Sequence, residues 1–363
     1  EFWDGPIPWA TVKDFKTSSL DSTLESITEE GVKNSATNIV PAGSIVVPTR
    51  MAVGKAAINT IDIAINQDLK ALLPKGEIDT RFLLHFLLSM SDFLEGQAQG
   101  ATVKGIKLDL LKSLPFPDLS LKEQRRIAEI LDKADGIRRK REQALDLTDE
   151  FLRSAFLDKF GDPGKNVGKH KVCRIVDLVD PNRPITYGIV QPGPHIEDGV
   201  PYIRVVDMRN GKVASASVRR TNHKIANSYK RSRLKPFDLL LSIRGHVGRM
   251  AFVPDDLDGA NLTQDTARLA FKSRYDAIYV RSVLETEALQ FEMSKRTKGG
   301  TVKGINLGDV KELQVPLPSV QQRESWAQLF LKHQELIERV RRALEESTLA
   351  FLSLSQRAFN GEL

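Results

Sequence analysis

Apolar residues recur at helical spacing through two long stretches of the chain, residues 118–160 and 318–360. In each stretch the pattern persists for roughly 35–40 residues, which corresponds to about 55–60 Å of helix at 1.5 Å per residue. A helix that is this apolar along one face is not stable alone in water. The pattern therefore predicts that the two helices pack against each other, and we expect them to be antiparallel.

Both stretches begin with the same local signal. Ser120 is followed three residues later by Glu123, and Ser319 by Gln322. This is capping-box spacing, in which the serine oxygen and the third side chain bond free N–H groups of the first helical turn. Each stretch ends at a glycine shortly after a phenylalanine, which is a typical stop. The two helices are therefore expected to begin and end at matching points.

Each of the two helices forms the C-terminal end of a unit that occurs twice in the chain. Short segments of the first half recur in the same order roughly 200 residues later, and Pro-x-Pro precedes both helices. The matched pairs are Ile7–Phe15 with Val200–Met208, Gly43–Lys55 with Asp238–Arg249, Asn66–Asp68 with Thr263–Asp265, and Thr102–Ile106 with Thr301–Ile305. Residue 1 aligns with about residue 195, so we expect the first copy to lack about 25–30 residues at its front.

These patterns predict an α+β fold with two mainly β domains separated by an antiparallel coiled-coil spacer and related by a pseudo-two-fold repeat. In chain order we expect a first domain, a spacer helix, a linker, a second domain and a second helix, at 1–117, 118–160, 161–169, 170–317 and 318–360. Strands are predicted at 201–208, 237–243, 249–253 and 266–271, and helical spacing is present at 79–94 and 276–294.

Charge is distributed unevenly between these parts. Residues 168–317 carry 25 Lys and Arg against 16 Asp and Glu, whereas residues 1–117 carry 11 against 14. The excess is greatest in residues 198–235, where ten basic residues face two acidic ones. Such a field attracts polyanions, and nucleic acid is the commonest of them. A solvated surface of strands and loops is the alternative.

Composition indicates the cellular environment of the protein. The longest apolar run, Phe82–Met90, is too short for the roughly 20 residues of a membrane span and is expected to be a core helix. The single cysteine, Cys173, excludes an internal disulfide, and no signal-peptide pattern is present, so we expect a cytoplasmic protein.

Motifs of catalysis are absent from the sequence. There is no Walker loop, no Gly-rich cofactor loop after a strand, and no Asp/Asn-Pro-Pro-aromatic tetrapeptide of amino-methyltransferases. The histidines lack metal-ligand spacing, and His333 is expected to be packed or to face a partner. Asp255, Asp256 and Asp258 could bind a metal but favour a solvated turn. We predict no catalytic and no metal-binding residues.

Each of two glycine-containing motifs allows two interpretations. The segment Arg244–Arg249, with glycines at 245 and 248, could cradle a phosphate through backbone N–H groups or form a tight hairpin that only glycine allows. Lys104 and Lys303 occupy equivalent positions in glycine-flanked loops, which favours a shared role. That role is either phosphate contact or structural support.

Together these features resemble the DNA-specificity subunit of type I restriction–modification systems. The resemblance rests on the two-copy order, the Pro-x-Pro exits into capped helices containing Gln124-Arg125 and Gln322-Arg323, and the Thr-Val-Lys-Gly-Ile segment in each copy. It also rests on Arg-Gly-x-Val-Gly at 244–248, whose weaker partner at 50–54 has Met51 in place of the first glycine. It covers essentially the whole chain.

The resemblance implies a non-catalytic reader of double-stranded DNA. Members recognise a bipartite target, one half with each domain, and the helical spacer sets the unread gap. They dock two methyltransferase subunits, which use S-adenosylmethionine to modify adenine, and motor and restriction subunits join for cleavage. The resemblance thus implies no cofactor in this chain itself and a role in DNA methylation and phage defence.

Residues that contact DNA are predicted from residue type alone, because arginine suits guanine edges and lysine suits phosphates. In the second domain they are Arg204, Arg209, Arg219, Arg220, Arg244, Arg249, Lys298 and Lys303, and in the first they are Lys13, Arg50, Lys55, Lys104 and Lys107. Two alternative functions stay open: the recognition part of a fused methyltransferase or nuclease, and a coiled-coil scaffold without a DNA role.

Overall fold

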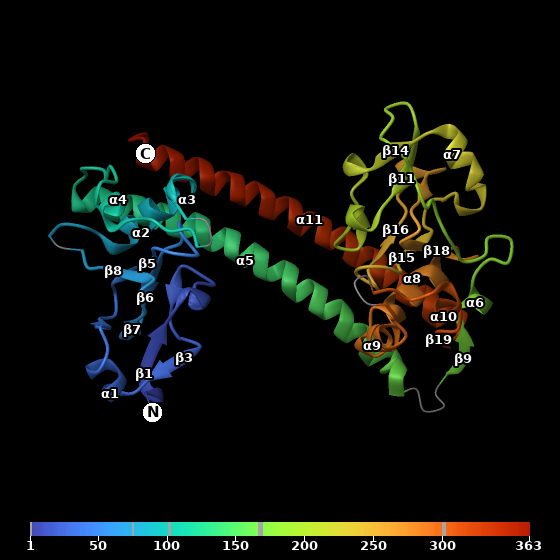
Figure 1. Ribbon diagram of the computed structural model, residues 1–363, viewed down its shortest axis with the longest axis horizontal. Helices are drawn as coiled ribbons and strands as arrows, with labels where there is room; N and C mark the ends of the chain where they lie inside the picture. The colour runs from blue at the N-terminus through green and yellow to red at the C-terminus, as the bar shows by residue number, and fades with distance from the viewer. Residues whose placement is uncertain (1, 75, 101–102, 166–169, 300–302) are drawn as a thin grey trace. The chain divides into compact units, whose positions relative to one another are not determined.

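The computed structural model describes residues 2–74, 76–100, 103–165, 170–299 and 303–363 (Figure 1). Contacts divide the chain into two compact units. Unit 1 comprises Glu1–Gln143 with Val340–Leu363, and unit 2 comprises Ala144–Arg339. The two long helices, α5 (Leu121–Phe160) and α11 (Val320–Phe359), each contribute one part to each unit.

Unit 1 contains sheets with strand orders β3-β1-β7-β4 and β2-β6-β5-β8. Its strands are β1 (Trp3–Ala10), β2 (Ser19–Leu20), β3 (Glu25–Ile27), β4 (Ile39–Val40), β5 (Ile45–Pro48), β6 (Ala57–Asn59), β7 (Ile63–Ile65) and β8 (Leu69–Leu72). Its shorter helices are η1 (Val12–Asp14), α1 (Glu29–Lys33), α2 (Thr80–Ser89), α3 (Ser91–Gln97) and α4 (Leu108–Lys112). The apolar faces of β5 and α2 form one core, where Ile45, Val47, Phe86 and Leu87 are buried.

Unit 2 contains sheets with strand orders β10-β18-β15-β16, β14-β11-β17, β12-β13 and β19-β9. Its strands are β9 (Lys171–Arg174), β10 (Thr186–Tyr187), β11 (Val200–Ile203), β12 (Met208–Arg209), β13 (Lys212–Val213), β14 (Arg219–Thr221), β15 (Leu239–Ser242), β16 (Met250–Phe252), β17 (Asn261–Leu262), β18 (Thr266–Leu269) and β19 (Gln314–Leu317). Its shorter helices are η2 (Pro163–Lys165), α6 (Ile175–Leu178), η3 (Val205–Asp207), η4 (Ser215–Ser217), α7 (His223–Ser228), η5 (Lys230–Ser232), η6 (Asp255–Leu257), α8 (Arg274–Leu284), α9 (Glu287–Lys295) and α10 (Leu307–Lys311).

The internal duplication is visible in the strand pairing. In unit 1, β5 pairs antiparallel with both β6 and β8, and in unit 2, β15 pairs antiparallel with both β16 and β18. The register also agrees: Ile45 lies opposite Leu72, and its counterpart Leu239 lies opposite Leu269. The parallel pair β1 and β7 recurs as β11 and β17. One sequence pattern has therefore produced one topology twice.

The helix starts have the predicted caps. The Glu123 carboxylate accepts from the Ser120 N–H at 3.2 Å, and the Glu123 N–H donates to the Ser120 hydroxyl oxygen at 3.3 Å. The Ser120 hydroxyl also donates to this carboxylate at 2.7 Å, and this bond, together with that from the Ser120 N–H, lowers the pKa of Glu123. At α11, the Ser319 N–H donates to Gln322 Oε1 at 3.0 Å and the reciprocal bond is 3.3 Å. Both capping boxes are confirmed.

The residue after each box attaches the long helix to the domain before it. In unit 1 the buried Gln124 side chain donates to the carbonyls of Leu119 and Glu77, at 2.9 and 3.0 Å, and accepts from the Asp79 N–H. In unit 2 the Arg323 guanidinium donates to the Pro318 carbonyl at 2.6 Å and to the Asp276 carboxylate at 2.7 Å. These bonds fix where each helix leaves its domain.

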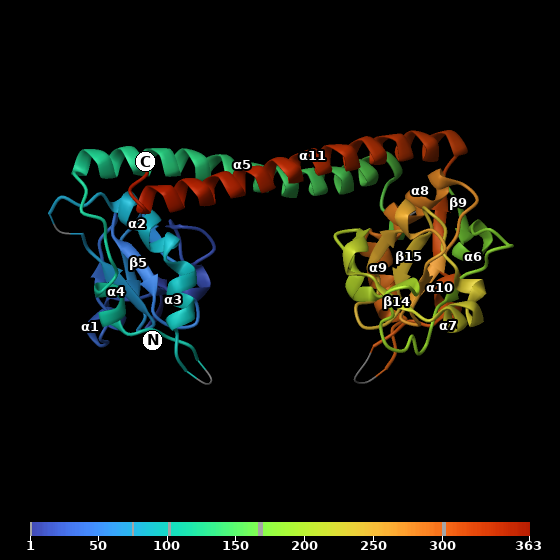
Figure 2. The ribbon, with the colours of Figure 1, turned by 90° about the horizontal axis from the view of Figure 1, so that it is seen from above.

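Within each unit, α5 and α11 run side by side in opposite directions (Figure 2). In unit 2 the end of α5 packs on the start of α11, where the Phe156 and Trp326 ring centroids are 5.1 Å apart. In unit 1 the start of α5, with Ile127 and Leu131, shares a cluster with Phe351 and Ala358 near the end of α11. The predicted fold class, including the antiparallel helices, is confirmed.

Several predicted elements differ in extent. The strand expected at 201–208 ends at Ile203, because residues 205–207 form the 3-10 helix η3, capped by the Asp207 carboxylate. The helical spacing at 276–294 is interrupted between α8 and α9, and that at 79–94 between α2 and α3. Residues 166–169 of the predicted linker lie outside the described residues. The domain boundaries stay a prediction, since the units divide both long helices.

Replacing Trp326 with alanine is expected to lower the free energy of unfolding of unit 2 by about 3–5 kcal/mol. The indole is fully buried, and its Nε1–H donates to the Ser282 hydroxyl at 2.9 Å. Urea denaturation of the purified chain, followed by far-ultraviolet circular dichroism, measures the loss. The matched control is Phe291→Ala, because Phe291 is 59% exposed and its removal is expected to cost about 0.5 kcal/mol. Equal losses in the two variants would contradict this account of the helix contact.

Candidate nucleic-acid interface

In unit 1, the chain leaving β5 forms a short backbone ladder around Gly105. Arg50 lies opposite Gly105 in an antiparallel bridge, and Gly105 also pairs with Gln99. Gln99 and Gly105 each donate an N–H to the other's carbonyl at 2.9 Å, and the Met51 N–H donates to the Lys104 carbonyl at 3.1 Å. We call Arg50, Gly105 and Gln99 the arginine edge of unit 1.

Unit 2 builds the same edge from equivalent positions. Arg244 lies opposite Gly304, which also pairs with Lys298. Lys298 and Gly304 exchange N–H bonds at 2.8 and 2.9 Å, and the Gly245 N–H donates to the Lys303 carbonyl at 3.0 Å. Arg244, Gly304 and Lys298 form the arginine edge of unit 2. The same backbone hydrogen bonds thus give the two edges the same local conformation.

A glycine lies opposite each arginine, at a position where a Cβ would be crowded. A Cβ on Gly105 would lie 3.0 Å from Arg50 Cγ and 2.9 Å from the carbonyl oxygen of the residue before Arg50. A Cβ on Gly304 would lie 3.0 Å from Arg244 Cγ and 3.0 Å from the equivalent carbonyl. In each unit the arginine stem therefore lies across the glycine. Both arginines are exposed.

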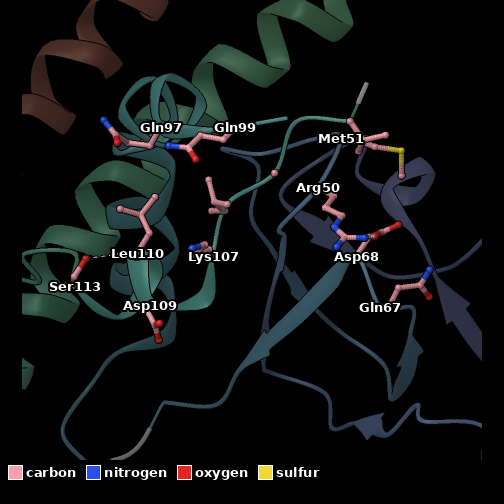
Figure 3. A pocket seen from close by; sticks show the side chains of 13 residues that line it. Arg50, Met51, Gln67, Asp68, Gln97, Gln99, Lys107, Asp109, Leu110 and Ser113 are labelled. Atoms are coloured by element: carbon pink, nitrogen blue, oxygen red, sulfur yellow. Dashed lines mark hydrogen bonds and ion pairs between the residues drawn. The ribbon is translucent and has the colours of Figure 1, made fainter. Parts of the chain in front are cut away.

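A cleft of about 930 Å³, lined by polar and apolar residues, adjoins the edge of unit 1 (Figure 3). Gln97 and Gln99 lie on one side of it, and Arg50 lies across from them with one guanidinium nitrogen 3.7 Å from Asp68 Oδ1. Lys107 also lines the cleft. Amide, guanidinium and ammonium groups that converge on one cleft suit the hydrogen-bonding edges of bases and the phosphates beside them.

The glycine segment 244–249 is a tight turn. Gly248 has φ +92°, and its N–H donates to the Ser242 carbonyl at 3.1 Å. The Ser242 hydroxyl in turn donates to the His246 carbonyl. Since the N–H groups of Gly245 and Gly248 both donate within the protein, the hairpin interpretation is supported for these two residues. Their use as a phosphate cradle would require these bonds to break.

Arg204 is the predicted contact residue with the strongest internal partner. Its Nε and Nη2 donate to the two oxygens of Asp207 at 2.9 and 2.7 Å, and these bonds raise the pKa of Arg204. Asp207 is buried, so removing Arg204 would leave a buried carboxylate without its main partner. The structure gives Arg204 a structural role at η3, and its contact with DNA stays a prediction.

The other predicted residues of unit 2 lie at the surface. Arg209, Arg219, Arg220, Arg244, Lys298 and Lys303 are exposed, whereas Arg249 is half-buried and donates to the Met208 carbonyl at 3.4 Å. Arg220 donates to the Gly199 carbonyl at 3.0 Å. Of the predicted set, Arg244, Lys298 and Lys303 meet at the arginine edge.

In unit 1 the predicted residues fall into two groups. Lys13 lies 3.9 Å from the Glu25 carboxylate, and Lys55 donates to the Phe15 carbonyl at 2.9 Å, so both ammonium groups have protein partners. Arg50, Lys104 and Lys107 gather at or beside the arginine edge. A DNA contact of each residue stays a prediction, and the geometry favours the second group.

A buried arginine holds part of the basic segment 198–235 in place. Arg268 is buried and donates to the carbonyls of Arg231, Arg233 and Pro184 at 2.8, 2.9 and 2.9 Å. Burial lowers the pKa of its guanidinium. One buried arginine thus holds the backbone that presents the exposed side chains of Arg231 and Arg233.

Sequence reasoning missed the glutamines of the cleft. Gln67, Gln97 and Gln99 line it, and a prediction from charge does not include uncharged residues. The repeat alignment could have indicated Gln99, because it is equivalent to the predicted contact residue Lys298. Amide side chains are also the usual partners of adenine.

The paired helices leave apolar side chains exposed in each unit. We call these the helix patches: Ile137, Leu349 and Leu352 in unit 1, and Leu147, Phe151 and Leu336 in unit 2. His333, in contrast, is buried and its Nε2 lies 2.7 Å from the Thr148 carbonyl, which confirms that it is a packed residue. Exposed apolar side chains along a long helix are typical of a surface that a partner covers.

Two further features follow from the described part of the chain. None of its helices combines the length and apolar composition that a membrane crossing requires. Within the same residues, no three His, Cys, Asp or Glu side chains are placed to hold a metal ion. The aspartates at 255 and 256 begin the 3-10 helix η6, as expected of a turn.

Comparison with known proteins decides the family. The family described as "Type I restriction modification DNA specificity domain" matches residues 1–147 and 194–346, one match in each copy. The chain belongs to this family. Its predicted function as a specificity subunit of type I restriction–modification systems is therefore confirmed, and neither alternative, fused enzyme or scaffold, finds support.

Individual relatives agree with this assignment. The chain is 27% identical over 359 residues to the EcoBI specificity subunit of Escherichia coli, covering 89% of this chain and 76% of that protein. A type I restriction–modification structure matches with TM-score 0.59 and 16% identity, covering 100% of this chain and 92% of the other. The specificity subunit of M. genitalium matches with TM-score 0.55 and 14% identity, at 98% and 93% coverage. The two structures support the fold alone.

The specificity subunit's glycine turn gives a direct test of local strain. Gly248→Ala is expected to destabilise unit 2 by about 1–3 kcal/mol, because φ is +92° and the new Cβ would meet Gln290 Oε1. Gly245→Ala is the matched control. Gly245 also has positive φ, but a Cβ there meets nothing within 4 Å, and Met51 occupies the equivalent position in unit 1. Chemical denaturation should show the larger loss for Gly248→Ala, and the reverse order would refute the close contact.

Proposed function

We propose that this specificity subunit reads a bipartite sequence in double-stranded DNA, one half-site with each unit. The observation that supports this most strongly is the arginine edge, built twice with the same hydrogen bonds and surrounded by different side chains. A repeated scaffold would approach each half-site in the same way, and different side chains would read different bases. The exposed basic residues of unit 2 add sequence-independent attraction to phosphates.

The long helices are proposed to set the unread gap between the half-sites. Each has 40 residues, about 60 Å at 1.5 Å per residue. Both caps and both ends are fixed by contacts within their units, so helix length would translate into a number of base pairs. The gap would then depend on the helices and the half-site sequences on the domains.

The helix patches are proposed to dock two methyltransferase subunits. Ile137 and Leu336 occupy equivalent positions of the repeat, and further exposed leucines or a phenylalanine lie on the paired helix of each unit. Two similar apolar surfaces in one chain suit two copies of one partner. The methyltransferases would bring S-adenosylmethionine and modify adenine, and motor and restriction subunits would join them in the cytoplasm.

Mapping methylated adenines tests the reader role. Cells that express this gene together with its methyltransferase partner are expected to methylate one bipartite motif with a fixed gap, and deletion of the gene should abolish it. Single-molecule sequencing of genomic DNA measures both. If the methyltransferase marks the same sites without this chain, the reader role is refuted.

Helix length supplies a second test of the same role. Inserting seven helical residues into both α5 and α11, after Gln143 and after Arg339, should add about 10 Å and widen the gap by about three base pairs. The half-site sequences should stay unchanged, because neither domain is altered. A gap that keeps its length while methylation persists would show that the helices do not set it.

Partner docking is tested with charge substitutions in the helix patches. Leu349→Glu combined with Leu352→Glu, or Leu147→Glu combined with Phe151→Glu, is expected to remove one methyltransferase subunit from the complex. All four side chains are more than half exposed, so the fold should persist. Native mass spectrometry gives the stoichiometry. Leu24→Glu, at an exposed leucine outside the long helices, is the control. Full occupancy in both double variants would exclude the patches as docking sites.

A further inference from the structure

Residues 99 and 298 are equivalent positions on the two arginine edges. Each exchanges two backbone hydrogen bonds with the central glycine, at 2.8–2.9 Å, and each precedes a glycine with positive φ, Gly100 at +137° and Gly299 at +118°. The side chains nevertheless differ, since residue 99 is glutamine and residue 298 is lysine. Both are exposed.

The backbone pairing around this position, with one arginine and one aspartate beside it, is the same in the two units. Arg50 corresponds to Arg244, and both lie across a glycine. Asp68 corresponds to Asp265, and the backbone carbonyl of each accepts from the chain just before the arginine, at 2.7 and 2.8 Å. The same backbone therefore presents one shared arginine and one variable side chain. A protein that reads two different half-sites with one scaffold needs such variable positions.

We propose that the side chain at this position reads a base, adenine through Gln99 in one half-site and guanine through Lys298 in the other. A glutamine amide can accept from N6 and donate to N7 of adenine, whereas lysine can only donate, which suits O6 and N7 of guanine. The proposal rests on the proposed function and assigns part of the sequence difference between the half-sites to one pair of residues.

The neighbouring lysines have a different role in this scheme. Lys104 and Lys303 are the same residue at equivalent positions, and the carbonyl of each accepts a bond from the residue after the edge arginine. Two different half-sites share phosphates but not bases, so an unchanged lysine suits phosphate contact. The variable position beside it suits base contact.

The experiment exchanges the variable side chains. Gln99→Lys and Lys298→Gln are made singly in the full chain, co-expressed with the methyltransferase partner, and read by single-molecule sequencing of methylated adenines. Gln99→Lys is expected to change adenine to guanine at one position of one half-site. Lys298→Gln is expected to change guanine to adenine at one position of the other. Each preference should shift about 10- to 100-fold in binding to matched duplexes.

Controls separate base reading from charge. Ala36→Lys adds a positive charge at an exposed position of unit 1 outside its edge, and Lys272→Gln removes one from the surface of unit 2 outside its edge. Both should leave the motif unchanged. Circular dichroism of all four variants checks that they fold, and Gln99→Ala provides a further variant, expected to accept several bases at the affected position.

The outcomes distinguish this proposal from the function on which it rests. A wild-type motif that depends on this chain, and that stays unchanged in Gln99→Lys and Lys298→Gln, overturns base reading by these residues while leaving the reader role intact. Uniform weakening without a changed base also overturns it, because that result is the signature of phosphate contact. If the wild-type chain directs no motif, the proposed function itself fails.

Discussion

The structure depends on an exchange of helix ends between the two copies of the repeat. The start of each long helix packs on the domain that precedes it, and the same cluster is completed by the end of the other helix. In unit 2, Phe156 and Phe160 of α5 enclose Trp326 of α11. In unit 1, Ala358 and Phe359 of α11 join Phe82 and Ile127. In each unit, one apolar cluster therefore contains residues of both copies.

This exchange explains the polar residues at the helix starts. A long helix that is held by a domain at one end needs a defined exit direction, and apolar contacts alone are poorly directional. Gln124 and Arg323 supply direction through bonds to the preceding carbonyl and to the start of the domain helix. The two residues differ chemically, and both donate to the carbonyl of the residue before the capping serine, whereas their second partners are the Asp79 N–H and the Asp276 carboxylate. The two copies therefore share the position of this attachment but not the side chain that makes it.

The sequence predicted what local chemistry determines. Capping boxes, glycine stops and helical spacing involve residues close in the chain, so Ser120 and Ser319 could be assigned without a structure. The arginine edge could not, because it pairs Arg50 with Gly105 and Arg244 with Gly304, residues more than fifty positions apart in the chain. Contact residues chosen by charge then included Arg204, which Asp207 holds, and omitted Gln99, which carries no charge.

A shared scaffold with variable side chains also accounts for where the glycines occur. At Gly105 and Gly304 a Cβ would crowd the arginine stem and the carbonyl oxygen before it, which favours glycine in both copies. At Gly245 the equivalent residue is Met51, which adopts positive φ and projects beside the cleft, because a Cβ there meets no other atom. The room available for a Cβ, more than the backbone conformation, therefore explains which of these glycines occur in both copies. The positions with free space are those where one unit can acquire a side chain that the other lacks.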